Sequence, residues 1–365
     1  MLSRNTYIEI NRENYISNYS YLKQRSATEL MPVIKGNGYG CGIVEIAKLN
    51  EKLGAKITAV AFLEEAVELR EAGVKTDILI FNYLNSCYFA KAVEIGAVIT
   101  LYSKKQIREY INENRAAFLA GRYHLNINTG MNNIGADFEE AEEIIKEAFS
   151  AGVKIEGVYS HFAAADGDEA RTEAQYMKFM EFIKKMEKSG IFFEKKHIGN
   201  SAAVINYGNR YSLDYVRCGM ALYGLQPDIK RADSNIKNVI SWKSSVIKVR
   251  ELKKGERINY GERYLSEENS RVAVIPVGYS DGYKMGNSNR GTVIIRGKKF
   301  PVIGAVCMDQ ITVKCDRTVS EGDEVILMGE SGNIKITAED IAFSAETIAD
   351  DIICSISSKI PRIYK

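Results

Sequence analysis

Short apolar runs and longer amphipathic stretches alternate through the first two thirds of the chain. Each run is rich in β-branched and aromatic side chains and is bounded by polar or turn-forming residues, which is the pattern of a β-strand. Eight strands are predicted on this basis, at residues 31–35, 57–62, 77–81, 97–101, 123–128, 155–161, 196–198 and 214–217.

Helical periodicity fills the stretches between these runs. One predicted helix is capped by Ser103 and places its apolar residues on a single face, namely Ile107, Tyr110, Ile111 and Phe118. Another begins at Asp137, with Glu140 three residues later, and its buried face holds Phe138, Ala141, Ile145 and Ala148.

Repeated strand–helix units indicate a parallel sheet with right-handed crossovers. Eight such units suggest a closed (β/α)₈ barrel over residues 10–235, an α/β fold of the TIM type. An open doubly wound sheet is the alternative. It is disfavoured because no Gly-x-Gly-x-x-Gly motif follows an early strand.

The pattern changes after about residue 236. Short β-branched runs separated by turn residues indicate strands at residues 246–249, 272–277, 292–295, 302–306, 311–314 and 324–327. A hairpin connection is predicted at residues 296–299, and one late helix, capped by Thr337, over about 338–348. Residues 236–365 are therefore expected to form a mainly antiparallel β domain, which residues 1–9 are candidates to join.

Composition narrows the class of protein. The chain has 365 residues and a formal charge of +2, without a basic stripe, so neither nucleic acid nor a membrane surface is expected as a partner. The N-terminus has no apolar signal region, and no run is long enough to span a bilayer. Six scattered cysteines and only three histidines make a metal site unexpected. Free thiols without a signal peptide favour the cytoplasm.

Lys35 closes the first predicted strand and opens a glycine-rich turn at residues 36–42, Gly-Asn-Gly-Tyr-Gly-Cys-Gly. An amine delivered into a loop of small residues can form a Schiff base with an aldehyde cofactor that lies against bare backbone. A nucleotide P-loop is excluded because it needs Gly-Lys-Ser/Thr at its end. The alternative interpretation of this segment by itself is a solvated lysine at a strand end.

Active sites of barrels lie at the carboxyl ends of the strands. Polar residues interrupt apolar strands at four such ends, where they are Lys35, His161, Asn200 with Ser201, and Arg217. A purely structural role for all four is less plausible than a shared one. We therefore expect these side chains to belong to one catalytic rim.

Residues 33–42 closely resemble the cofactor-lysine segment of alanine racemases, which use pyridoxal phosphate (PLP). Similar matches in the expected order cover nearly the whole chain, at residues 159–162, 199–202, 216–224, 259–261, 277–283, 307–309 and 361–362. Several motifs at the expected spacing make this resemblance specific. It implies a barrel followed by a β domain, and a PLP-dependent racemase that interconverts L- and D-alanine.

The resemblance also implies roles for residues at the cofactor. Lys35 would hold PLP covalently, with His161 and Asn200 beside it, and the phosphate would be bound by Ser201, Tyr39 and the backbone of Gly219 and Met220. Ser201 starts a helix after a strand, so amides and the positive end of the helix dipole are available to the phosphate. The alternative role for Ser201 is a plain helix cap, and for Tyr39 an aromatic lid over the loop.

Arg217 would face the pyridine nitrogen of PLP by the same resemblance. A guanidinium stays charged, so it donates a hydrogen bond but does not readily protonate the ring. An unprotonated ring is a poorer electron sink, which disfavours transamination and suits an enzyme that removes one α-proton and returns it. The alternative is a structural arginine in a buried salt bridge.

Racemisation needs a base on each face of the substrate Cα. Lys35 can serve one face, and Tyr260 resembles the second base of the family. In the family this tyrosine reaches across from a second subunit, which implies a homodimer with shared active sites. By themselves, residues 259–261 would indicate a β-turn.

The chain departs from the family pattern near the substrate. Family members usually carry Lys-x-Asp-Thr-Gly-Met-x-Arg after the fifth strand, with the lysine often carbamylated, whereas Asn126 and Asn133 stand at its first and last positions here. Without the arginine, the backbone amide of Met308 remains to hold the substrate carboxylate, and a small anion beside Asn126 is left open. Ser358 replaces a tyrosine that narrows the alanine pocket.

Alanine is the expected substrate, and serine or a broader set of amino acids is the alternative. A decarboxylase of basic amino acids on the same two-domain plan is another, but it carries a different phosphate loop, and residues 307–309 match its cysteine and aspartate only superficially. A non-catalytic PLP-binding protein would lack the second domain, for which this chain has about 130 residues.

Overall fold

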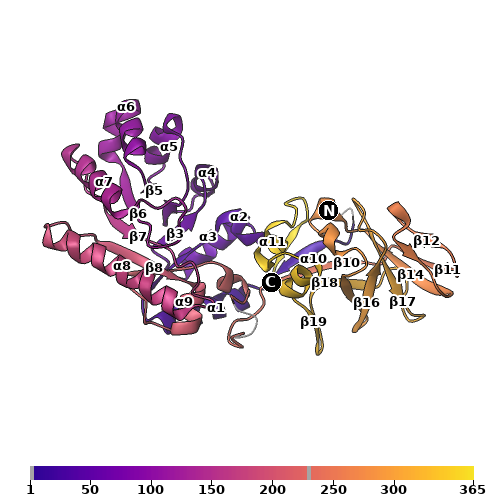
Figure 1. Cartoon of the computed structure of the whole chain (residues 1–365). Coiled ribbons are helices and arrows are strands. Elements are labelled where there is room, and N and C mark those ends of the chain that lie inside the picture. Colours follow the sequence, from indigo (N-terminus) through magenta and orange to yellow (C-terminus); the bar gives the residue numbers. More distant parts are fainter. Residues whose placement is uncertain (1–3, 228–231) are drawn as a thin grey trace.

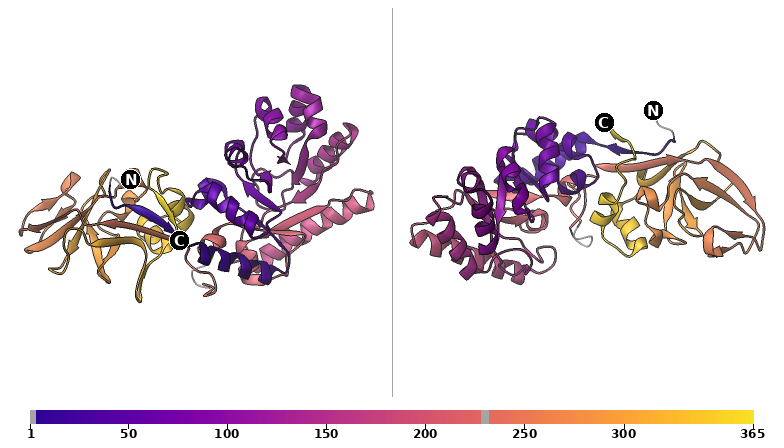
Figure 2. Two further views of the ribbon diagram at one scale, coloured as in Figure 1. Left: turned by 180° about the vertical axis from the view of Figure 1, so that it is seen from behind. Right: turned by 90° about the horizontal axis from the view of Figure 1, so that it is seen from above.

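The computed structural model describes residues 4–227 and 232–365, and residues 1–3 of the N-terminal segment expected to join the β domain lie outside the described residues. The molecule is elongated. A helix-covered barrel forms one end and a β-rich part the other, with α10 (Ala338–Ala345) and α11 (Ala349–Cys354) between them (Figures 1 and 2). None of the described helices is both long and apolar enough to cross a membrane.

Eight parallel strands form the barrel in the order β2-β9-β8-β7-β6-β5-β4-β3. Their bounds are β2 (Glu29–Pro32), β3 (Ile57–Val60), β4 (Asp77–Ile80), β5 (Ala97–Leu101), β6 (Arg122–Asn126), β7 (Gly157–Tyr159), β8 (Lys195–Asn200) and β9 (Tyr215–Cys218). A parallel bridge between Val33 and Ala59 brings the two edge strands together. The predicted barrel is confirmed, and the open sheet is wrong.

Helices surround the barrel on its outer face (Figure 1). They are α1 (Arg12–Ser26), α3 (Ile43–Lys52), α4 (Leu63–Glu71), α5 (Phe89–Glu94), α6 (Lys104–Ala120), α7 (Phe138–Ser150), α8 (Glu169–Lys188) and α9 (Ser201–Tyr207). Ser103 caps α6 as predicted, since its hydroxyl accepts from the Gln106 amide. Asp137 precedes α7 but does not cap it, because its carboxylate accepts from Asn128 Nδ2 at 3.0 Å instead.

The predicted strand at residues 31–35 is wrong at its end. β2 stops at Pro32, and Lys35 instead begins α2 (Lys35–Tyr39), a short coil turned by the glycines. Gly36, Asn37 and Gly38 have φ angles of 64°, 55° and 62°, a left-handed conformation that glycine adopts without strain and asparagine tolerates. The chain therefore curls over the carboxyl end of the barrel directly after the strand.

The β-rich part is built on a sheet in the order β11-β14-β17-β16-β15-β18-β10-β1-β20, with β19 on β18. Its strands are β1 (Tyr7–Ile10), β10 (Ile240–Ser245), β11 (Lys248–Leu252), β14 (Ser270–Ile275), β15 (Thr292–Ile295), β16 (Lys298–Ile303), β17 (Ile311–Cys315), β18 (Glu324–Ser331), β19 (Ile334–Ile336) and β20 (Arg362–Tyr364). A separate hairpin joins β12 (Arg257–Ile258) to β13 (Tyr264–Leu265). The N-terminal β1 pairs antiparallel with β10 and parallel with β20.

Two turns in this part differ from expectation. The hairpin between β15 and β16 uses only Arg296 and Gly297, whose φ angles of 47° and 70° suit the tight turn that matches strand twist. Thr337 caps α10 as predicted, but the single late helix is wrong, because Glu346 at φ 58° ends α10 before α11 begins. α11 packs against the turn after Lys35, where a Cβ on Gly40 would lie 2.3 Å from the Ile353 carbonyl.

Candidate active site

A cavity of about 310 Å³ opens at the carboxyl ends of the barrel strands. It brings together most of the residues that the sequence singled out, and these are Lys35, Tyr39, Asn133, His161, Asn200, Ser201, Arg217, Gly219 and Met220. They come from several different strand ends, so closure of the barrel is what assembles them.

Arg217 lies at the base of this cavity and is 3% exposed. Its Nη1 donates to Nδ1 of His197 at 2.8 Å, and its Nη2 donates to the Ser160 carbonyl at 2.6 Å and to Nδ1 of His161 at 2.8 Å. Within the described residues its Nε–H has no hydrogen-bond partner and no carboxylate pairs with it. The salt-bridge alternative is therefore wrong, and one N–H remains for a ligand.

The groups around Arg217 are electrically neutral. Burial lowers the pKa of Arg217 to about 10, so it stays charged at neutral pH. Desolvation and the positive charge of Arg217 lower the pKa of His161 to about 3 and hold that of His197 well below its ordinary value. Since an arginine only donates, each imidazole accepts through Nδ1 and carries its hydrogen on Nε2. The Tyr159 ring adds its π-face, 5.2 Å from the guanidinium carbon.

Hydroxyl groups gather where β8 and β9 end. Ser201 Oγ accepts from the Gly219 amide at 3.2 Å, and a Cβ on Gly219 would lie 2.4 Å from the Tyr39 hydroxyl. Asn200, not Ser201, caps α9, because its Oδ1 accepts from the Ala203 amide at 3.0 Å. Ser201 is therefore not needed as the helix cap, and it lines the cavity. Glycine at 219 keeps this cradle open, and the two hydroxyls suit an anion.

These groups fit PLP. Lys35 supplies an amine that is exposed to the cavity and pairs with no carboxylate in the described part of the chain. Ser201 and Tyr39 supply donors for a phosphate, and Arg217 Nε–H supplies a donor for a ring nitrogen. An aldehyde that also carries a phosphate and a basic ring nitrogen uses all three features at once.

Asn126 and Asp350 line the cavity and His197 lies beside Arg217, but none of the three was among the predicted site residues. From the sequence, Asn126 was considered only as the neighbour of a small anion. Asn126 lines the cavity and is 8% exposed. His197 lies in β8 and is 0% exposed, and its only signal in the sequence was a histidine within a predicted strand. Asp350 enters from α11, and burial raises its pKa although the charge of Lys35 opposes that shift. An acidic residue in the first turn of a helix is ordinary, so the sequence offered no sign of its place here.

Three predicted residues lie outside this cavity. Tyr260, in the short helix η4 (Tyr260–Glu262), is 81% exposed, and Met308 is 54% exposed. Ser358 is exposed in the segment that follows α11. Within one chain, Tyr260 and Met308 on the β-rich part do not meet Lys35.

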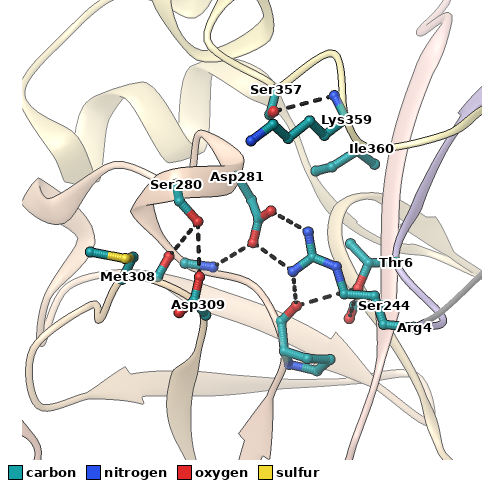
Figure 3. A network of polar contacts seen from close by, with 12 residues as sticks. Arg4, Thr6, Ser244, Ser280, Asp281, Met308, Asp309, Ser357, Lys359 and Ile360 are labelled. Carbon is teal, nitrogen blue, oxygen red and sulfur yellow. Dashed lines mark hydrogen bonds and ion pairs between the residues drawn. The ribbon is translucent and has the colours of Figure 1, made fainter.

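The loop that carries Met308 is firmly held (Figure 3). The Ser280 hydroxyl donates to the Met308 carbonyl at 2.9 Å, and a Cβ on Gly278 would lie 2.2 Å from that same oxygen. Asp281 accepts from the Gly278 amide at 3.0 Å and from Arg4 Nη1 at 2.9 Å (Figure 3). The exposed Met308 side chain thus stands on a rigid support.

No group of three or more histidine, cysteine, aspartate or glutamate side chains in the described ranges is arranged to hold a metal ion.

Comparison with known proteins matches the whole chain. Residues 10–227 match "Alanine racemase, N-terminal domain" and residues 239–364 match "Alanine racemase, C-terminal domain". The alanine racemase of Carboxydothermus hydrogenoformans is 37% identical over 99% of this chain and 100% of its own, and that of Halothermothrix orenii is 36% identical over 100% and 98%.

Solved structures give the same result. An alanine racemase from Bacillus anthracis with bound L-Ala-P has a TM-score of 0.95 at 30% identity, covering 100% of this chain and 96% of its own. One from Streptomyces lavendulae has a TM-score of 0.94 at 30% identity, covering 100% and 98%. This chain therefore belongs to the alanine racemase family of PLP-dependent amino-acid racemases.

Proposed function

We propose that this chain interconverts L- and D-alanine, with PLP on Lys35 and a homodimer as the working unit. The observation that carries the proposal is that one cavity contains both the Lys35 amine and the Nε–H of the buried Arg217, each without a partner among the described residues. The relatives named alanine racemase support alanine as the substrate. A cytoplasmic location is proposed as well, supported by all six cysteines being free thiols.

The cavity residues divide the task of holding the cofactor. Lys35 Nζ binds the aldehyde, and the hydroxyls of Ser201 and Tyr39 bind the phosphate. Arg217 donates its Nε–H to the ring nitrogen and leaves it unprotonated, because a guanidinium holds its own proton. Bound PLP supplies the chemistry that acidifies the α-hydrogen of an attached amino acid.

Two bases then exchange that hydrogen on opposite faces. The Lys35 amine would hold a proton on one side of Cα. Tyr260 of a second copy would serve the other side, since in its own chain it is 81% exposed and does not line the cavity that holds Lys35. Because one base removes the proton from one face and the other base delivers a proton to the opposite face, the configuration at Cα is inverted.

The same exposure supports the proposed homodimer. Tyr260 and Met308 stand on the β-rich part with their side chains open to solvent, and neither lines the cavity of its own chain. A second copy that laid this surface over the cavity would bring Tyr260 to Cα and the Met308 amide to the substrate carboxylate. Asn133, at the cavity rim, would lie on the other side of that carboxylate.

The first experiment combines cofactor trapping with substrate turnover. Borohydride treatment of the PLP-loaded protein should attach the cofactor to the peptide that contains Lys35. The Lys35→Ala variant should lose both labelling and racemisation, whereas Lys48→Ala, at an exposed lysine of α3, should keep both. Incubation with a panel of L-amino acids should yield D-alanine. Labelling at another lysine, or amine and CO₂ in place of the D-enantiomer, would contradict the proposal.

A further inference from the structure

A column of polar side chains runs through the inside of the barrel below Arg217. Arg217 on β9 donates to Nδ1 of His197 on β8 at 2.8 Å, and Nε2 of His197 lies 3.0 Å from Nδ1 of His124 on β6. Both histidines are 0% exposed. The interiors of such barrels are ordinarily filled with layers of apolar side chains, so polar side chains in this position indicate a specific role.

The positions of the ring hydrogens of His197 and His124 follow from their contact with Arg217. Arg217 can only donate, so Nδ1 of His197 must accept and the neutral ring carries its hydrogen on Nε2. That hydrogen is then donated to Nδ1 of His124, whose own hydrogen lies on Nε2. Burial lowers the pKa of His124 to about 3 and that of His197 well below its ordinary value, so both rings stay neutral.

The contact between the two histidines spans an intervening strand. β7 lies between β6 and β8, and Gly157 on β7 is in register with His124. A Cβ at Gly157 would lie 2.6 Å from Nε2 of His124, so any side chain there would displace the ring. The absence of a side chain at Gly157 therefore permits His124 to reach His197.

A histidine at position 124 lowers the stability of the fold in one respect. Its Nε2–H is buried and has no partner among the described residues, and an unpaired buried donor is unfavourable. A leucine of similar volume would avoid that penalty. What histidine offers here, and leucine does not, is the Nδ1 acceptor for His197.

We propose that His124 is a positioning residue for Arg217: by accepting from Nε2 of His197, it holds the His197 ring with Nδ1 toward Nη1 of Arg217 and so aims Nε–H of Arg217 into the cavity. Without that acceptor, the Nε2–H of His197 would be buried and unpaired, so the ring would no longer be held in place against Nη1 of Arg217. The catalytic consequence rests on the proposed function, whereas the hydrogen positions do not.

The test is ¹⁵N NMR of protein labelled at the histidine ring nitrogens, which gives only three pairs of signals because the chain has three histidines. In the PLP-loaded wild type, His197 and His124 should both be protonated at Nε2 alone and should not titrate between about pH 6 and about pH 9. His124→Leu should shift the His197 signals and slow racemisation by about three- to tenfold. In His124→Asn, Oδ1 can replace the acceptor, so the His197 signals should return to their wild-type positions. The rate of racemisation should return to within about twofold of wild type.

Gly157→Ala supplies an independent variant, because it displaces the His124 ring without changing its chemistry; it should shift the His197 signals in the same direction. The proposal is overturned by a wild-type His197 protonated at Nδ1 or charged, or by wild-type signals and rate in His124→Leu. If His124→Leu does not fold, the wild-type spectrum and Gly157→Ala still decide. Predicted tautomers in a protein that racemises no amino acid would overturn the proposed function and leave the positioning role standing.

Discussion

Nη2 of Arg217 lies 2.8 Å from Nδ1 of His161. Because arginine donates, this contact fixes His161 as an acceptor at Nδ1 and leaves its Nε2–H directed elsewhere. His161 is exposed to the cavity, and desolvation with the charge of Arg217 lowers its pKa to about 3, so its ring is neutral. It can therefore offer a donor, but no positive charge, to a group that enters the cavity from outside.

Replacing Arg217 with glutamate should slow D-alanine formation by about 10²-fold and raise the yield of keto acid. A carboxylic acid can share a proton with the ring nitrogen and so improve its capacity as an electron sink, which a guanidinium does not do. Both products are measured from L-alanine with the PLP-loaded protein. Arg217→Lys keeps the charge and serves as the control, in which keto acid should not rise. A glutamate variant that matched wild type in both products would make Arg217 structural.

Replacing Tyr260 with phenylalanine should reduce racemisation by about 10² to 10⁴-fold, the usual contribution of a general base. Binding of L-alanine should be retained, because Lys35 and the phosphate donors are unchanged, and this is measured from the spectral change on adding substrate. Asp350→Asn is the matched control, since Asp350 is the carboxylate that lines the cavity within one chain. If Asp350→Asn lost most of its racemase activity while Tyr260→Phe stayed active, the second base would be Asp350.

Because Tyr260 is exposed in its own chain, we expect racemase activity to depend on association of two chains. Specific activity should fall on dilution in step with dissociation of the dimer, measured by light scattering or sedimentation. An equimolar mixture of Lys35→Ala and Tyr260→Phe chains should recover activity, because one of the two sites in a mixed dimer then has both bases. A fully active monomer would contradict the shared site.

Replacing Ser358 with tyrosine should raise the ratio of kcat/KM for alanine over serine by about tenfold. An aromatic ring in place of a small hydroxyl narrows the space next to the substrate side chain, and one extra group in such a pocket is worth about 1–3 kcal/mol of selectivity. Ser358 is exposed within one chain, so the effect requires that its segment approach a bound substrate in the dimer. An unchanged ratio, or no turnover of serine by wild type, would leave alanine alone as the substrate.

Glu156 should make the fold sensitive to acid. Burial opposes ionisation of Glu156, but hydrogen bonds from Arg122 and Lys195 outweigh it and lower its pKa to about 2. A carboxyl whose folded pKa lies below its unfolded value stabilises the fold above about pH 4.5 and loses that contribution as the pH falls toward 2. Urea unfolding of Glu156→Gln should show a loss of about 1–3 kcal/mol at pH 7, and a smaller dependence on pH below 4.5.

Glu194→Gln is the control for this measurement. Glu194, just before β8, pairs with Lys154. The two side chains are 60% and 66% exposed, so screening by solvent leaves this ion pair little effect on stability. Its unfolding curves should follow those of wild type at each pH. Equal behaviour of Glu156→Gln and Glu194→Gln would show that the buried ion pairs do not set the acid sensitivity.

Much of the local secondary structure of this protein could be predicted from its sequence. The strand at 97–101, the Ser103 and Thr337 caps and the Arg296-Gly297 turn each depend on residues within a few positions of one another. Lys35 was singled out because its amine precedes a glycine turn, and that turn is present although the strand before it ends at Pro32. Family motifs then supplied the roles that spacing alone could not.

Other features required the folded chain. His124, His197 and Arg217 meet because β6, β8 and β9 close into one barrel and Gly157 leaves room between them, yet each histidine by itself reads as a buried strand residue. Asp350 reaches the cavity only because Glu346 ends α10 and α11 packs on the turn after Lys35. Such contacts depend on strand order, register and side-chain volume over long separations, whereas hydrophobic periodicity reports only which face of each element is buried.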